Sequence, residues 1–207
     1  MSYEKKERIV FAVLMLAFLC AVAAHYALSP WGFYAAADPA EARLRLQVVQ
    51  TAEAWLGANE LSGSHREILA VYNSHQPLAM DYVVQDTDSW CAAYVSAVAI
   101  RAQLTDIIPT ECGCERQIGL LQALGSWEEN DNAVPQPGDL IYYDWDMTRP
   151  GECSGWSDHV GIVVGTKWPF VKVIEGNKDD SVSYRVIPLG HKSIRGYGRP
   201  DYAASRR

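Results

Sequence analysis

Three residues that lie far apart in the chain have the side chains needed for thiol chemistry. Cys91 stands in the stretch DSWCAAY, where a polar run gives way to an alanine-rich segment. His159 begins the apolar run HVGIVVG, and Glu175 lies near the end of FVKVIEGN. A cysteine, a histidine and a third residue that orients the imidazole make the standard arrangement for thiol-dependent acyl transfer. The sequence therefore offers a candidate nucleophile, base and orienting group.

The thiol of Cys91 is predicted to lie in the first turn of a helix. The segment WCAAYVSAVAIRAQL has apolar residues at helical spacing, and four residues suited to an N-cap precede it: Asp86, Thr87, Asp88 and Ser89. The positive end of a helix dipole lowers the pKa of a thiol, and first-turn N–H groups can bind an oxyanion. The alternative is that Cys91 is a small residue of the core.

The runs that contain His159 and Glu175 are predicted to form a β-hairpin with its turn centred near Lys167. Antiparallel pairing then places Val160 opposite Ile174 and His159 opposite Glu175. Side chains on one face of such a pair have Cβ atoms about 5 Å apart, so the carboxylate comes within reach of the imidazole.

Asn177 has the same parity as Glu175 if the strand continues, and it is a second candidate for orienting the ring. The alternative for His159 is an exposed histidine at a strand end. The alternative for Glu175 is a solubilising charge on a sheet edge.

The composition is that of a folded globular protein, with 207 residues, 49% hydrophobic and 21% charged. The net charge is -7 and no block of five or more lysines and arginines occurs, which argues against nucleic acid as a partner. About 170 residues follow the N-terminal segment, enough to form one core without disulfides. We expect a monomer.

Residues 9–28 form an apolar run whose one ionisable residue is His25. Its length suits a transmembrane helix. The charged residues 1–8 would stay in the cytoplasm by the positive-inside rule. The alternative is a cleaved signal peptide, with alanines near 21–24 or 35–37 as cleavage sites. Either interpretation exports a domain at 41–207, after a linker at 29–40.

Export changes what is expected of the cysteines, because disulfides persist outside the cytosol. We expect Cys153 to pair with Cys112 or Cys114, since a link between the latter two would be strained. A zinc site built from these three and His159 is an alternative, but the spacing fits no standard pattern. The sequence therefore predicts no metal and no organic cofactor.

The order of the predicted elements indicates an α+β fold. Helices are expected at residues 41–57 and 65–72, after residue 90, and at 115–129. Strands are expected in PQPGDLIYYDWD, HVGIVVG, FVKVIEGN and SVSYRVIPL. Helices followed by a run of antiparallel strands should pack as helices on one sheet.

Five phrases in order carry a family resemblance: SWCAAYVS, PQPGDLIYYDWD, DHVGIVV, VIEGN and IRGYGRPDY. Over roughly residues 75–202 the chain resembles the CHAP family of bacterial cysteine amidases and peptidases, which is related in fold to papain and to NlpC-type hydrolases. The resemblance implies that Cys91 is the nucleophile and His159 the base, with Glu175 and Asn177 orienting the ring. It further implies cleavage of a peptidoglycan amide, either between glycan and stem peptide, as in an N-acetylmuramoyl-L-alanine amidase, or within a peptide.

Aromatic residues are the candidates for binding such a substrate. Tyr82, Trp90 and Trp156 could line a groove, as could Trp145 and Trp168, although packing in the core or a hairpin is the alternative for each tryptophan. Two other functions stay open: a wall-binding or scaffold module of an export or conjugation apparatus that has lost hydrolysis, and a cysteine acyltransferase.

Overall fold

The computed structural model describes residue 15, residues 38–145 and residues 156–206. The predicted membrane segment at 9–28, apart from Met15, lies outside these residues, and so does Cys153. Within the described ranges no helix combines the length and the apolar character needed to cross a bilayer. Residues 33–207 make up one compact unit, and all the elements below belong to it.

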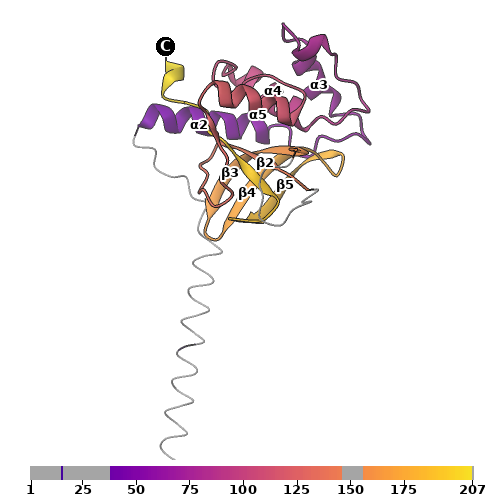
Figure 1. Ribbon diagram of the computed structural model, residues 1–207. Helices are drawn as coiled ribbons and strands as arrows, with labels where there is room; N and C mark the ends of the chain where they lie inside the picture. Colours follow the sequence, from indigo (N-terminus) through magenta and orange to yellow (C-terminus); the bar gives the residue numbers. More distant parts are fainter. Residues whose placement is uncertain (1–14, 16–37, 146–155, 207) are drawn as a thin grey trace, which may run out of the picture. The chain divides into compact units, whose positions relative to one another are not determined.

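Four α-helices lie on one side of a sheet (Figure 1). They are α2 (Pro39–Glu53), α3 (Arg66–Asn73), α4 (Cys91–Ala102) and α5 (Cys114–Ala123), with short 3₁₀ turns at Ala79–Asp81 and Ala204–Arg206. Helix α2 begins inside the predicted linker, where the Asp38 carboxylate accepts a 2.8 Å hydrogen bond from the Ala40 N–H.

Six antiparallel strands form the sheet in the order β1-β6-β2-β3-β4-β5. They are β1 (Trp127–Glu128), β2 (Leu140–Tyr143), β3 (His159–Lys167), β4 (Phe170–Lys178), β5 (Ser181–Pro188) and β6 (Ile194–Gly198). The fold is thus the expected mixture of helices and an antiparallel sheet. The helix predicted over 115–129 is too long, because α5 ends at Ala123 and residues 127–128 pair with β6 as a strand.

The small residues of α4 let this helix lie against the sheet at very short range. Ala92, Ala93 and Ala97 are completely buried. On the strand side, a Cβ added at Gly176 would stand 2.5 Å from the Cβ of Tyr94, so only glycine fits there. The main core fills the space between the helices and this face of the sheet, and a smaller cluster that includes Val163, Val173 and Tyr197 covers the other face.

A bulge in β3 decides which side chains of β3 and β4 share a face. Near the turn Lys167 pairs with Phe170, whereas farther along Ile162 pairs with Ile174, so Val164 is an extra residue. A one-residue shift moves every side chain of a strand to the other face. Without the bulge, the register would put His159 and Glu175 on opposite faces.

The predicted hairpin register was therefore wrong by two residues, but the predicted face was right. Ile174 pairs with Ile162 and not with Val160, because the loop is shorter than expected and the bulge then shifts the strand. A shift of two residues preserves the face. His159 and Glu175 consequently lie diagonally across the strand pair and not directly opposite.

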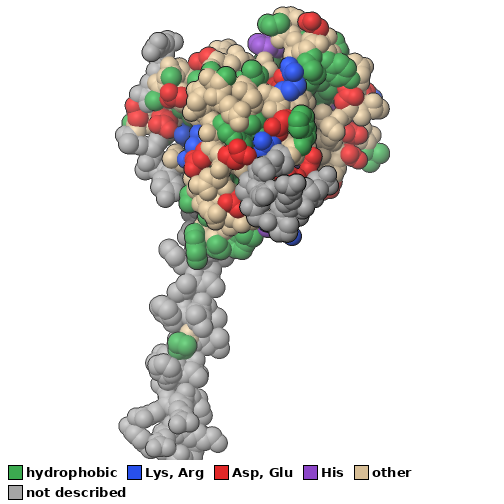
Figure 2. Space-filling view, viewed as in Figure 1, with side chains coloured by type: hydrophobic (Ala, Val, Ile, Leu, Met, Phe, Trp, Pro, Cys, Tyr) green, Lys and Arg blue, Asp and Glu red, His purple; other side chains and the backbone are tan. Residues whose placement is uncertain are grey.

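Charged side chains of both signs are intermixed on the face that Figure 2 displays, and no single-sign patch dominates it. Among the described residues, several basic groups belong to ion pairs within the domain, such as Arg45 with Asp139 and Arg195 with Glu115. On this face the described residues form no continuous basic stripe of the kind that follows a nucleic-acid backbone.

Candidate active site

The thiol of Cys91 lies at the first residue of α4, as predicted, and is 4% exposed. The cap differs from the prediction. Trp90 occupies the N-cap position and makes no side-chain cap hydrogen bond. Asp88 instead accepts hydrogen bonds from the Gln85 N–H and the Tyr82 hydroxyl, both at 2.7 Å. Within the described part of the chain, no side-chain cap therefore competes for the first-turn N–H groups beside the sulfur.

His159 and Glu175 come together on one face of the sheet. The Nε2 atom of the imidazole lies 3.2 Å from Oε2 of the carboxylate. Glu175 is fully buried and the His159 side chain is 12% exposed. A charge with so little solvent must be paired, and Arg185 on β5 supplies the second partner. Its Nε donates to both carboxylate oxygens, at 2.7 and 2.9 Å.

The pKa of Cys91 is held well below its usual value. The largest cause is a hydrogen bond from the thiol of Cys114, whose Sγ lies 3.6 Å from the Cys91 Sγ. Burial acts in the opposite direction, while hydrogen bonding to His159 and the charge of its ring lower the pKa further. The sulfur is therefore poised as a thiolate, the form that attacks carbonyl carbon.

The His159 ring is held in its charged form. Burial by itself would lower its pKa, but the hydrogen bonds and negative charges of Cys91 and Glu175 outweigh burial and raise the pKa to about 9. For Glu175, burial disfavours the charge, but His159 and Arg185 keep the pKa below its usual value. These shifts favour the charged form of each group, so that a thiolate, an imidazolium and a carboxylate lie in a row.

Asn177 does not join this row. Its backbone has a left-handed conformation, with φ of 57°, and the pairing between β4 and β5 shifts between Glu175 and Lys178. Among the described residues, hydrogen bonds hold the His159 ring through Glu175, and none joins it to Asn177. The parity argument for Asn177 fails because the strand does not continue regularly to that position.

The predicted substrate-binding aromatics differ in exposure. Trp90 is fully buried and its Nε1 donates to Glu60 at 2.9 Å, so it is a core residue and cannot offer its ring to a substrate. Tyr82 is 42% exposed and Trp156 is 73% exposed, and their role stays a prediction. Trp145 stacks on Tyr143 with ring centroids 4.8 Å apart.

Cys91, Cys112 and Cys114 are free thiols in this structure. The predicted bridge from Cys153 therefore does not occupy either Cys112 or Cys114. The Cys112 sulfur lies 3.6 Å from a carboxylate oxygen of Glu111, and burial together with this negative charge raises the pKa of Cys112.

Two residues of the site were not identified from the sequence. Arg185 could have been found, because Glu175 pairs with Ser183 across the β4–β5 hairpin and Arg185 has the same parity as Ser183. Cys114 could not, because its contact with Cys91 depends on how α5 packs beside α4. Nothing in the local sequence fixes the placement of one helix against the other.

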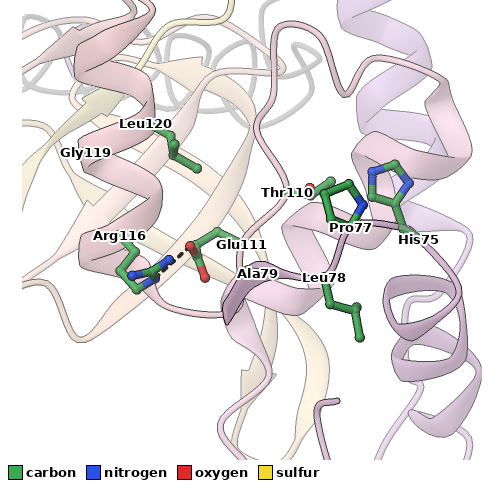
Figure 3. A pocket seen from close by; sticks show the side chains of 9 residues that line it. All are labelled: His75, Pro77, Leu78, Ala79, Thr110, Glu111, Arg116, Gly119 and Leu120. Carbon is green, nitrogen blue, oxygen red and sulfur yellow. Dashed lines mark hydrogen bonds and ion pairs between the residues drawn. The ribbon is translucent and has the colours of Figure 1, made fainter. Parts of the chain in front are cut away.

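A pocket of about 450 Å³ opens beside the loop that leads into α5 (Figure 3). Its lining comes from His75 and residues 77–79, from Thr110 and Glu111, and from Arg116, Gly119 and Leu120 on α5. Arg116 donates from Nε to the buried carboxylate of Glu111 at 2.8 Å. None of Cys91, His159 and Glu175 lines this pocket, which is therefore distinct from the row of reactive groups.

A protein-family model matches the part of the chain that contains these residues. Residues 80–177 match the family model described as CHAP domain, and this range contains Cys91, His159 and Glu175. No curated protein matches the chain. One solved structure, described as "The crystal structure of Ly7917", is 15% identical with a TM-score of 0.37, over 75% of this chain and 62% of that one. The chain thus spans less than two thirds of the length of that structure.

The range that matches the family model ends at Asn177, but the folded unit continues beyond this residue. Strand β6 lies beyond the range and still pairs with β2, which is within it. The family match confirms the resemblance read from the five phrases: residues 80–177 are similar to the CHAP domain.

Proposed function

We propose that this protein is a cysteine hydrolase that cleaves an amide bond of peptidoglycan. The observation that carries the proposal is the convergence of three side chains from one helix and two strands. Cys91 is buried at an uncapped helix start, His159 interacts with it, and Glu175 holds the ring at 3.2 Å. The CHAP family match supports the substrate class.

The first half of the proposed reaction forms an acyl-enzyme. The Cys91 thiolate attacks the carbonyl carbon of the scissile amide, and the first-turn N–H groups of α4 stabilise the developing oxyanion. The His159 imidazolium donates its proton to the leaving amine. The product at this stage is a thioester on Cys91 and a free amine.

The second half releases the acyl group. His159, now neutral, takes a proton from water, and the resulting nucleophile attacks the thioester carbonyl. Glu175 keeps the ring oriented and stabilises the imidazolium through both halves, and Arg185 keeps Glu175 in place. The products are a carboxylate and the regenerated thiolate.

The substitution Cys91→Ala tests the proposal. The variant should fold, because alanine fits a buried position at a helix start, but it should release fragments from purified wall roughly 10⁴-fold more slowly or not at all. Cys112→Ala is the matched control, since it removes a nearby thiol that touches none of the three groups, and it should keep activity. Full activity of Cys91→Ala with an unchanged melting temperature would refute the mechanism.

Mass spectrometry of fragments from defined muropeptides identifies the bond. A new amine on the stem peptide together with a free lactyl carboxyl on the muramic acid would assign an amidase, whereas a cut between amino acids would assign an endopeptidase. Repeating the digestion with an added amine separates hydrolysis from acyl transfer, because only transfer yields a new amide.

We also propose that the domain works outside the cytoplasm. The apolar run at 9–28 supports this, as an anchor in the cytoplasmic membrane or as a cleaved signal peptide. Fractionation of cells that produce the full chain, with the N-terminus of the mature protein sequenced, decides between the two.

A further inference from the structure

The Cys91 and Cys114 thiols meet where two helices begin. Each sulfur belongs to the first residue of its helix, Cys91 in α4 and Cys114 in α5, and the Sγ atoms lie 3.6 Å apart. A disulfide requires about 2.05 Å, so the sulfurs need to approach by only about 1.5 Å. The two residues are 4% and 8% exposed.

Buried hydrogen bonds hold the segment before α5 in this position. Ser96 of α4 donates from Oγ to the Glu111 carbonyl at 2.7 Å and accepts from the Glu111 N–H at 2.8 Å. Gln117 donates to the Pro109 carbonyl and accepts from the Tyr142 hydroxyl, both at 2.8 Å. These polar groups are nearly inaccessible to water, which makes their pairing costly to lose. The contact between the thiols is therefore fixed by the fold.

The three described thiols differ in their readiness to react. The pKa of Cys91 is lowered, whereas the pKa of Cys114 is raised, chiefly because the Cys114 thiol donates its proton in the hydrogen bond to Cys91 and because Cys114 is buried. The pKa of Cys112 is raised as well. Oxidants react with the thiolate, so Cys91 is the first target and Cys114 is the thiol placed to respond.

We propose that a peroxide converts Cys91 and Cys114 into a reversible disulfide, and that this bond switches off the thiol chemistry of the site. The inference rests on the proposed role of Cys91 as nucleophile. The bond would occupy the sulfur that must attack substrate, and the proposed export would place the pair where disulfides persist.

The chemistry proceeds in two balanced steps. The Cys91 thiolate attacks one peroxide oxygen, the O–O bond breaks, and Cys91 becomes a sulfenic acid while hydroxide leaves. The Cys114 thiol then attacks the sulfenic sulfur, the S–S bond forms, the S–O bond breaks, and water leaves with the thiol proton. Two thiols and one hydrogen peroxide thus give one disulfide and two waters. Dithiothreitol reverses the reaction by thiol exchange and is itself oxidised to a cyclic disulfide.

Peptide mapping of the full chain tests the inference without any wall substrate. The reduced protein is treated with hydrogen peroxide, remaining thiols are blocked with iodoacetamide, and the digest is analysed by mass spectrometry. The expected result is a linked pair of peptides containing Cys91 and Cys114, about 2 Da lighter than the sum of the reduced peptides. Iodoacetamide labelling of Cys91 should be lost on oxidation and should return after dithiothreitol.

Two variants sharpen the experiment. Cys112→Ser keeps both reacting sulfurs and should give the same linked pair. Cys114→Ser removes the responding thiol, so Cys91 should proceed to the sulfinic acid, about 32 Da heavier, and dithiothreitol should no longer restore labelling. If Cys114→Ser does not fold, Cys114→Ala is used in its place. The peptide mapping of the unmodified chain tests the inference without either variant.

The outcomes separate this inference from the proposed function. A link from Cys91 to Cys112 or Cys153, or a sulfinic Cys91 in the unmodified chain without any link to Cys114, overturns the inference. A Cys91–Cys114 link in a protein that never cuts wall leaves the inference standing and overturns the hydrolase. Hydrolysis that persists after full formation of the link overturns the switch, and it removes Cys91 from the mechanism.

Discussion

Arg185 donates from its Nε atom to both carboxylate oxygens of the buried Glu175, at 2.7 and 2.9 Å, while one of these oxygens faces His159 at 3.2 Å. Glu175 thus links Arg185 on β5 to His159 on β3, so the placement of the imidazole depends on the arginine. The guanidinium also lies over the ring of Trp145, with its carbon 4.9 Å from the centroid, so it is held from two sides.

Replacing Arg185 with methionine should reduce kcat/KM roughly 10- to 100-fold, with most of the loss in kcat. Glu175 would lose its fixed partner, its pKa would rise, and it would hold the imidazolium less strongly. The pH–rate profile provides the decisive readout, since the alkaline limb of the profile should move to a lower pH. Arg43→Met, at an exposed position of α2, is the control. If the alkaline limb of the pH–rate profile stays at the same pH in Arg185→Met, the role of Arg185 is structural only.

The pH dependence of kcat/KM should be bell-shaped with its alkaline limb near 9. His159 has a pKa raised to about 9, and the proposed reaction needs its charged form, so activity is lost as the pH rises through that value. The lowered pKa of Cys91 sets the acid limb.

The same pKa shift affects stability. A histidine whose pKa is higher in the folded state stabilises the fold fully below the unfolded value of 6.5, and this contribution disappears as the pH rises through 9. Chemical denaturation at several pH values checks this. Cys91→Ala should weaken the dependence, because a negative neighbour of the ring is removed. A pH-independent difference between the two proteins would contradict the thiolate–imidazolium pair.

Gly161→Ala should damage both stability and activity. A Cβ at this position would stand 2.5 Å from Cγ1 of Val173 and 2.7 Å from Cγ of Glu175. Since both side chains are buried, the cost should be about 1–3 kcal/mol, and Glu175 should be pushed away from His159.

Gly119→Ala in α5 is the matched control for this substitution. Nothing lies within 4 Å of the added Cβ, so the change should be neutral or stabilise the helix by up to about 1 kcal/mol. Denaturant melts of both variants, together with their wall-release rates, provide the comparison. Equal stabilities for the two variants would show that the sheet accommodates a side chain at Gly161.

Arg45→Met should be among the most destabilising surface substitutions. Arg45 on α2 donates to the Asp139 carboxylate at 2.7 Å, and Asp139 is 1% exposed. Removing one partner leaves a buried charge, which typically costs about 3–5 kcal/mol. The free energy of unfolding in denaturant measures the loss.

Arg66→Met is the comparison, because its pair with Asp86 is exposed on both sides and should contribute about 0–1 kcal/mol. Asp139 also accepts from the Gln136 N–H, as expected of a turn residue at the start of β2. If both arginine substitutions cost the same, the Arg45 pair does not anchor α2 to this turn.

The sequence by itself determined the type of most elements, although not of β1 and β6, and the identity of the candidate triad. Helical spacing placed Cys91 in a first turn, and alternation placed His159 and Glu175 on strands, because these patterns are local. The hairpin argument also found the correct shared face. The net charge and the five family phrases can also be read from the sequence without knowledge of the fold.

Tertiary structure decided the rest. The bulge at Val164 and the burial of Trp90 arise from packing between elements. The order of the sheet, with β6 between β1 and β2, depends on chain crossings that no local pattern encodes. The meeting of Cys91 and Cys114 is the clearest case: each thiol begins its own helix, and only the packing of one helix beside the other brings the two sulfurs into contact.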